Sequence, residues 1–180
     1  MNAKKPVTGF NAAPALSASG ASEFERVGFQ IKGLKPTNGL NIGIVRSLFR
    51  SALTKQMQAV VEKRAQDVGA KIPQILLARG ALETPLLAAL LLAQPATDGV
   101  VVLAAVIKGQ TAHDDVVVRE TTRALVKLSL QYGKPVGIGI IGPGVTLQQA
   151  HERVTEYAQG ALDAVILSAS QLKSMKKSKK

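Results

Sequence analysis

The chain has 180 residues and no cysteine, which excludes disulfide bonds, thiolate nucleophiles and Cys-ligated metal sites. Hydrophobic residues make up 46% of it but aromatic residues only 3%, so its core must be built from aliphatic side chains. The formal net charge is +11, and five lysines lie in the last ten residues, so the rest of the chain is only moderately basic.

The first 28 residues predict a flexible, basic arm ahead of the folded domain. Residues 1–22 are rich in Ala, Ser, Asn, Gly and Pro and contain no acidic residue, a composition that does not support a packed core. A leader of this kind is also typical of organellar transit peptides, although no Arg precedes Arg26. We therefore expect a cytoplasmic protein, with a mitochondrion or plastid as the alternative. The most apolar run, residues 86–93, is too short to span a membrane.

Residues 29–172 form one predicted domain, in which short apolar runs alternate with longer segments of helical period. This alternation is typical of a parallel α/β sheet. Right-handed crossovers between parallel strands bring the carboxyl ends of the strands to one edge, where functional loops gather. The expected strands are Phe29–Lys32, Asn41–Arg46, Gln74–Ala78, Gly99–Val106 and Pro135–Ile141.

Segments with helical periodicity lie between these strands and after the last of them. The segment Glu83–Ala93 is almost wholly apolar, which predicts burial on more than one side. The last third is expected to be helical with a break at Gln159-Gly160, and the lysines of residues 173–180 are expected to form a solvated tail. The expected helices are Ala52–Val68, Glu83–Ala93, His113–Gln131, Val145–Ala158 and Ala161–Met175.

The loop after the strand Gly99–Val106 contains the most informative candidate residues. Gly109 and Thr111 precede a helix start, where backbone N–H groups and a hydroxyl form a natural anion site. His113 falls in the first turn of that helix, where the positive end of the helix dipole favours a neutral imidazole that can accept a proton. A purely structural interpretation stays open, with Thr111 as an N-cap and His113 as a surface residue beside Asp115.

Two further strand ends carry candidate residues with two interpretations each. Glu83 near a helix start either complements the helix dipole or accepts hydrogen bonds from substrate hydroxyls. Phe49 either packs as a hydrophobic staple on the next helix or offers a flat surface to a heteroaromatic ring. Spacing alone does not separate these alternatives.

Four blocks of sequence occur in a distinctive order. They are Lys-Gly-Leu at 32–34, Leu-Phe-Arg at 48–50 with Thr54, Arg-Gly-Ala-Leu-Glu-Thr-Pro at 79–85, and Val-Ile-Lys-Gly-Gln-Thr-Ala-His-Asp-Asp at 106–115. In this order they resemble the 6,7-dimethyl-8-ribityllumazine synthase family of riboflavin biosynthesis, over about residues 29 to 175. The resemblance implies an α/β fold, a flavodoxin-like three-layer α/β/α sandwich with a parallel four-stranded sheet and an N-terminal edge strand.

The resemblance also implies a reaction and a set of site residues. The family condenses 5-amino-6-ribitylamino-pyrimidinedione with 3,4-dihydroxy-2-butanone 4-phosphate, without metal or cofactor. His113 would be the catalytic residue that moves protons. The pyrimidine and its ribityl chain would be bound by Phe49, Ala81, Leu82, Glu83, Val106 and Ile107. The phosphate would be bound by Gly109, Gln110 and Thr111. The neighbouring subunit would add Ile138 and Arg153.

The implied partners are copies of the same chain and two small substrates, one a phosphate and one a pyrimidine. Family members form pentamers, decamers or icosahedral 60-mers, and we expect no membrane association. Because the site loops depart from the family pattern at positions such as Arg50, Leu82 and Asp114, a second hypothesis stays open. In it the chain is a non-catalytic scaffold or shell protein whose Lys-rich tail binds nucleic acid or an acidic partner through charge attraction.

Overall fold

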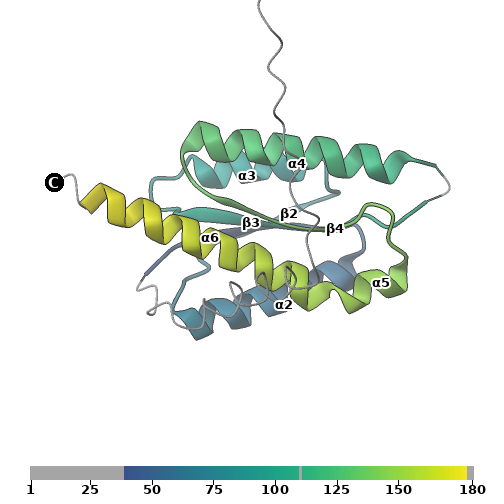
Figure 1. Ribbon diagram of the computed structural model, residues 1–180, viewed down its shortest axis with the longest axis horizontal. Coiled ribbons are helices and arrows are strands. Elements are labelled where there is room, and N and C mark those ends of the chain that lie inside the picture. The colour runs from purple at the N-terminus through teal and green to yellow at the C-terminus, as the bar shows by residue number, and fades with distance from the viewer. Residues whose placement is uncertain (1–38, 110, 178–180) are drawn as a thin grey trace, which may run out of the picture. The chain divides into compact units, whose positions relative to one another are not determined.

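The computed structural model describes residues 39–109 and 111–177, all within one compact unit of residues 35–180. Strands and helices alternate as the sequence predicts (Figure 1). The strands are β1 (Ile42–Ser47), β2 (Ile75–Ala78), β3 (Gly99–Ala105) and β4 (Val136–Ile141). The helices are α2 (Ser51–Val68), α3 (Thr84–Leu92), α4 (His113–Tyr132), α5 (Leu147–Glu152) and α6 (Val154–Lys177). The predicted edge strand Phe29–Lys32 and the arm of residues 1–28 lie outside the described residues.

The sheet has the strand order β2-β1-β3-β4, and every neighbouring pair is parallel. The central strands β1 and β3 are buried along their whole length, so apolar residues occupy both faces of β3 and of residues 42–45 of β1. The last two residues of β1, Arg46 and Ser47, are buried polar residues. Side chains of β3 still point alternately to the two faces. Val101 and Leu103 belong to the cluster on one face, while Val100 and Val102 belong to the cluster on the other.

Helices cover both faces of the sheet, which confirms the three-layer architecture. α2, α5 and α6 lie on one side and α3 and α4 on the other (Figure 1). The α2–α6 side is built on residues such as Ile44, Met57 and Leu162, and the α3–α4 side on residues such as Leu91 and Leu125. The fully buried side chains of both clusters are aliphatic, as the shortage of aromatic residues predicts.

One expectation about the helices is wrong. α6 runs without interruption through Gly160, and the break falls at Arg153, between α5 and α6. A helical glycine costs only about 1 kcal/mol, and the burial of Ala161, Leu162 and their neighbours outweighs that cost. The helix α3 is buried against both the sheet and α4, as its apolar sequence predicts, although Leu86 is 69% exposed in the single chain.

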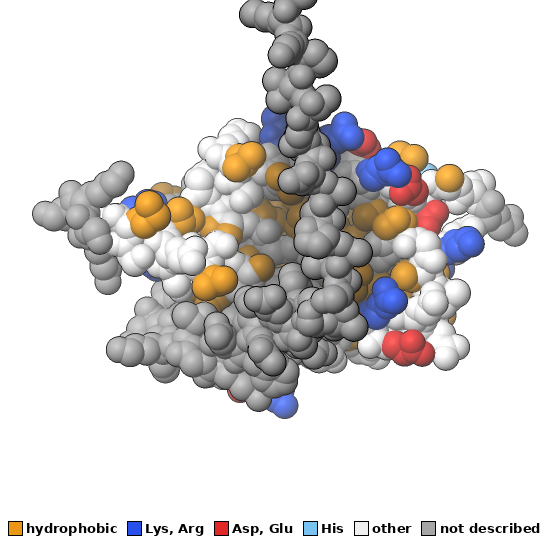
Figure 2. All heavy atoms as spheres, viewed as in Figure 1, with side chains coloured by type: hydrophobic (Ala, Val, Ile, Leu, Met, Phe, Trp, Pro, Cys, Tyr) orange, Lys and Arg blue, Asp and Glu red, His pale blue; other side chains and the backbone are white. Residues whose placement is uncertain are grey.

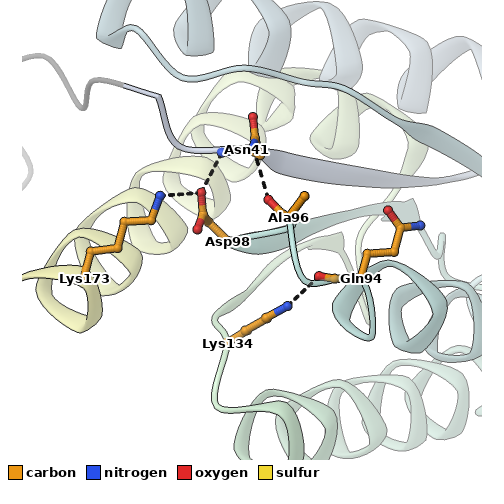
Figure 3. A network of polar contacts seen from close by, with 6 residues as sticks. All are labelled: Asn41, Gln94, Ala96, Asp98, Lys134 and Lys173. Carbon is orange, nitrogen blue, oxygen red and sulfur yellow. Dashed lines mark hydrogen bonds and ion pairs between the residues drawn. The ribbon is translucent and has the colours of Figure 1, made fainter. Parts of the chain in front are cut away.

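Polar contacts join the segments at the amino ends of the strands, opposite the strand ends that carry the candidate loops (Figure 3). Asp98 Oδ2 accepts from the Asn41 N–H and from Lys173 Nζ, both at 2.8 Å. Nearby, Lys134 Nζ donates to Leu92 O at 2.8 Å and Gln94 O at 2.7 Å. The Lys134 ammonium thus satisfies carbonyl groups at the C-terminus of α3, where a positive charge is favourable.

We expect the contribution of Lys134 to stability to depend on pH. Burial lowers the pKa of its amine from 10.5; Asp98 opposes this shift and Lys176 adds to it. Between the lowered pKa and 10.5, the unfolded chain retains a proton that the folded chain has lost, so stability rises with pH in that window. Urea unfolding should show the wild type gaining stability relative to Lys134→Met as the pH rises through the lowered pKa toward 10.5. A constant or shrinking difference would contradict this assignment.

Candidate active site

A pocket of about 520 Å³ lies at the carboxyl ends of β1, β2 and β3. Its walls come from the turn after β1, from residues 79–83 between β2 and α3, and from residues 105–114 between the end of β3 and the start of α4. These are three of the strand ends at which a parallel sheet is expected to carry functional loops.

The turn between β1 and α2 presents Phe49 to the pocket. The Leu48 N–H donates to Ala78 O at 2.7 Å. The Phe49 N–H donates to Arg79 O at 3.0 Å, so the turn is held along the end of β2. The Phe49 ring is 61% exposed, and the guanidinium carbon of Arg50 lies 5.5 Å from its centroid. This exposure favours the flat-surface interpretation of Phe49 over a staple buried against α2.

The loop between β2 and α3 is closed by Glu83, whose Oε2 accepts from the Gly80 N–H at 2.8 Å. Glu83 is the N-cap residue of α3 and makes no side-chain capping bond, so its exposed carboxylate faces the pocket as well as the helix start. The Thr84 hydroxyl donates to Ala81 O at 2.6 Å and fixes the same turn. Ala81 and Leu82 line the pocket beside Glu83, as the resemblance implies.

The segment between β3 and α4 forms the third wall, which Val106, Ile107 and Gly109 line. Ala112 is the N-cap residue of α4, so the prediction that Thr111 is the N-cap is wrong. Thr111 is exposed and lines the pocket, and His113 does the same as the first residue of the helix. Gln110, predicted to bind phosphate, lies outside the described residues.

Two predicted site residues do not line this pocket. Ile138 is half-buried on β4 and packs against the cluster on the α3–α4 side of the sheet. Arg153 is exposed at the C-terminal end of α5. Both were expected to reach the pocket of a neighbouring subunit, and that role stays a prediction.

The pocket also contains three cationic residues that are absent from the predicted set: Arg50, Arg79 and Lys108. Within the described part of the chain, none of them forms an ion pair with a carboxylate. The two pocket carboxylates, Glu83 and Asp114, instead accept hydrogen bonds from backbone N–H groups. Unpaired cations in a concave site favour an anionic ligand. Their positions in strand-end loops were the sequence signal that could have identified them.

Other kinds of site are not seen in the described residues. Residues 39–109 and 111–177 contain no group of His, Asp or Glu side chains that could hold a metal ion. In the same ranges, no helix combines the length and the apolar composition needed to cross a membrane.

Comparisons with known proteins identify the family of this chain. Residues 39–173 match the sequence model of the family 6,7-dimethyl-8-ribityllumazine synthase. The protein of that name from Staphylothermus marinus is 45% identical over 77% of this chain and 92% of its own length. Those from Sulfolobus acidocaldarius and Methanocaldococcus jannaschii are 39% and 38% identical over 76% of this chain, and over 87% and 96% of their own lengths. The chain therefore belongs to the 6,7-dimethyl-8-ribityllumazine synthase family.

Proposed function

We propose that this protein is a lumazine synthase of riboflavin biosynthesis. It condenses 5-amino-6-ribitylamino-pyrimidinedione with 3,4-dihydroxy-2-butanone 4-phosphate to give 6,7-dimethyl-8-ribityllumazine, and releases phosphate and water. The observation that carries this proposal is that one pocket, in a chain of this family, combines the exposed ring of Phe49, the carboxylate of Glu83 and the Thr111–His113 helix start. We propose the cytoplasm as its compartment, since no Arg precedes Arg26 and transit peptides are usually rich in Arg.

The pyrimidine end of the pocket is formed by Phe49 and Glu83. The exposed ring of Phe49 provides a face on which a flat heterocycle stacks, and the backbone around Ala81 and Val106 lines the same space. Glu83 holds the Gly80 N–H with one carboxylate oxygen. Its other oxygen accepts hydrogen bonds from the ribityl hydroxyls, so the chain fixes the orientation of the first substrate.

The phosphate end is formed by residues 108–113 at the start of α4. Backbone N–H groups of this segment and the dipole of a 20-residue helix attract the phosphate of the second substrate. The Thr111 hydroxyl donates to it, and Lys108 adds a positive charge at the same wall. Arg153 of a neighbouring subunit pairs with the phosphate from the other side.

His113 lines the pocket in which the two substrates react, and several steps of this reaction transfer protons. The amine of the pyrimidine attacks the ketone of the second substrate, and water leaves as the imine forms. Loss of a proton from the adjacent hydroxyl-bearing carbon then expels phosphate and leaves an enol, which tautomerises to a new carbonyl. The second nitrogen attacks this carbonyl and closes the ring with loss of a second water. His113 takes up and returns protons in these steps, a contribution of about 10²- to 10⁴-fold for a well-placed general acid–base. Holding both substrates together supplies much of the remaining acceleration.

We propose that the protein works as a homo-pentamer, which can assemble further into decamers or icosahedral 60-mers. Figure 2 shows hydrophobic side chains open to solvent on one face of the described chain, among charged ones. On α3 Leu90 is 56% exposed, and on α4 Val126 is 48% and Leu130 is 80% exposed. Exposed apolar side chains on two adjacent helices are typical of a surface that is covered in an assembly. Light scattering distinguishes the pentamer from the larger assemblies by mass.

The scaffold hypothesis has less support. Part of the Lys-rich segment belongs to α6, and Lys173 forms an ion pair with Asp98 at 2.8 Å. That lysine is thereby committed to a contact within the chain rather than to nucleic acid.

We expect purified protein to form the fluorescent lumazine from the two substrates well above the spontaneous rate. Fluorescence of the product is followed over time at saturating pyrimidine, with a matched reaction that lacks protein. Omission of either substrate should abolish the signal, because the product contains carbon atoms from both. Formation of product at only the spontaneous rate would refute the proposed activity and favour the scaffold hypothesis.

A further inference from the structure

The loop at residues 142–144, between β4 and α5, is attached to the phosphate end of the pocket. One backbone hydrogen bond flanks the loop on each side. The Val106 N–H donates to Ile141 O at 2.8 Å, and the Lys108 N–H donates to Val145 O at 2.9 Å. Within the loop, the Gly144 N–H donates to Asp114 Oδ2 at 2.9 Å. Only this last bond depends on the identity of a side chain.

Asp114 is a buried carboxylate at the phosphate end of the pocket. It lies in the first turn of α4, lines the pocket next to His113, and is only 8% exposed. No cation pairs with it in residues 39–109 and 111–177. A buried carboxylate is costly without a partner, and its negative charge opposes the binding of an anion nearby. Its bond to Gly144 is therefore the contact that offsets this cost.

The loop is Gly142-Pro143-Gly144, and both glycines adopt positive φ, at 124° and 77°, a region that glycine enters at low cost. The bond from Gly144 to Asp114 joins this loop to the start of α4. The segment between β3 and α4 is therefore held at both ends, at Asp114 by this bond and at Lys108 by its bond to Val145.

We propose that Asp114 is a positioning residue for phosphate binding. By tying the start of α4 to the loop at 142–144, it holds the backbone N–H groups of Lys108, Gly109 and residues 111–113 in the geometry that accepts the phosphate of the second substrate. This inference rests on the proposed function, because it assigns the phosphate to that segment.

The test compares Asp114→Ala with Asp114→Asn in the full-length protein. Alanine removes the acceptor, whereas the Asn side-chain oxygen can still accept from the Gly144 N–H. Asp114→Ala should raise KM for the butanone phosphate by about tenfold, and should weaken inhibition by inorganic phosphate by a similar factor. KM for the pyrimidine should change by less than about twofold. Asp114→Asn should bind phosphate at least as tightly as the wild type, because it keeps the acceptor and removes the opposing charge.

Asp115→Ala is the matched control. Asp115 lies in the same first turn of α4, so its removal takes away the same charge from the helix start. Its carboxylate pairs with Arg119 at 2.9 Å and does not line the pocket. Asp115→Ala should leave KM for the butanone phosphate unchanged. Equal effects of the two alanine variants would overturn the proposal, because Asp115 makes no bond to Gly144 and the effect would then not depend on that bond.

Hydrogen exchange separates this inference from the proposed function. The Gly144 amide should exchange faster in Asp114→Ala than in the wild type and in Asp114→Asn, whether or not the protein turns over its substrates. A wild type without turnover refutes the proposed function alone. Turnover with unchanged KM for the butanone phosphate in Asp114→Ala refutes the positioning role alone, as does unchanged exchange at Gly144.

Discussion

Replacing His113 with alanine is expected to lower kcat by about 10²- to 10⁴-fold, the range over which a positioned general acid–base contributes. His113 is exposed at the first position of α4 and lines the pocket beside Thr111. In the proposed mechanism the imidazole moves protons in successive steps, whereas backbone groups and Phe49 hold the substrates. The loss should therefore appear mainly in kcat, with KM for both substrates changed by only a small factor.

The chain offers a matched control, because its second histidine is also exposed and helical. His151 lies on α5 and does not line the pocket, so His151→Ala should retain most of the activity. Lumazine formation by the two variants and the wild type is measured under the same saturating conditions. A His113→Ala protein with wild-type kcat would remove His113 from the mechanism, and an equal loss in both variants would point to a general effect of the substitution.

The sequence predicts the order of the described elements well because each strand is a short, mainly apolar run. β1 and β3 are buried on both faces, and such strands differ clearly from the amphipathic segment Ser51–Val68 that forms α2. The predicted strands Gly99–Val106 and Pro135–Ile141 exceed the observed ones by only one residue each. Local composition is sufficient to predict an element wherever the burial of a segment and its secondary-structure preference agree.

The errors occur where tertiary packing overrides a local signal. Gly160 predicted the end of a helix, but α6 continues through it since the helix packs on β3 and β4 along its length. The apolar helix α3 packs on the sheet and on α4 as predicted, yet Leu86 is 69% exposed in the single chain. No local pattern distinguishes an apolar face that contacts the core of the chain from one that a second subunit covers.

In the candidate site, too, the sequence could identify some residues but not the role of others. Phe49, Glu83 and His113 could be proposed because each lies in a strand-end loop within a recognisable motif. The role of Asp114 could not, because its partner Gly144 is 30 residues away in the sequence. Contacts between loops of different strands depend on the register of the sheet, and the motifs carry no information about them.

Replacing Gly137 with alanine is expected to destabilise the fold by about 3 kcal/mol or more, at the upper end of overpacking substitutions. Gly137 lies on β4 where α6 crosses the sheet. A Cβ there would overlap the Ala161 carbonyl oxygen, and would lie 2.8 Å from both Ala161 C and Val165 Cγ2. Because two of these atoms belong to the helix backbone, a change of rotamer cannot relieve the overlap. β4 and α6 must therefore move apart, which weakens the packing of Val165 between them.

Gly160→Ala is the matched control, because Gly160 lies on α6 directly before Ala161, the residue that a Cβ at position 137 would overlap. A Cβ at Gly160 meets no atom within 4 Å, and alanine has a higher helix propensity than glycine, so this variant should be more stable by about 0.5–1 kcal/mol. The free energies of unfolding of both variants and the wild type are compared by urea denaturation followed by circular dichroism. Opposite signs for the two substitutions would show that the close approach of β4 and α6 at Gly137, rather than the added methyl group, causes the loss. A stable Gly137→Ala protein would mean that the helix does not approach the strand as closely as described.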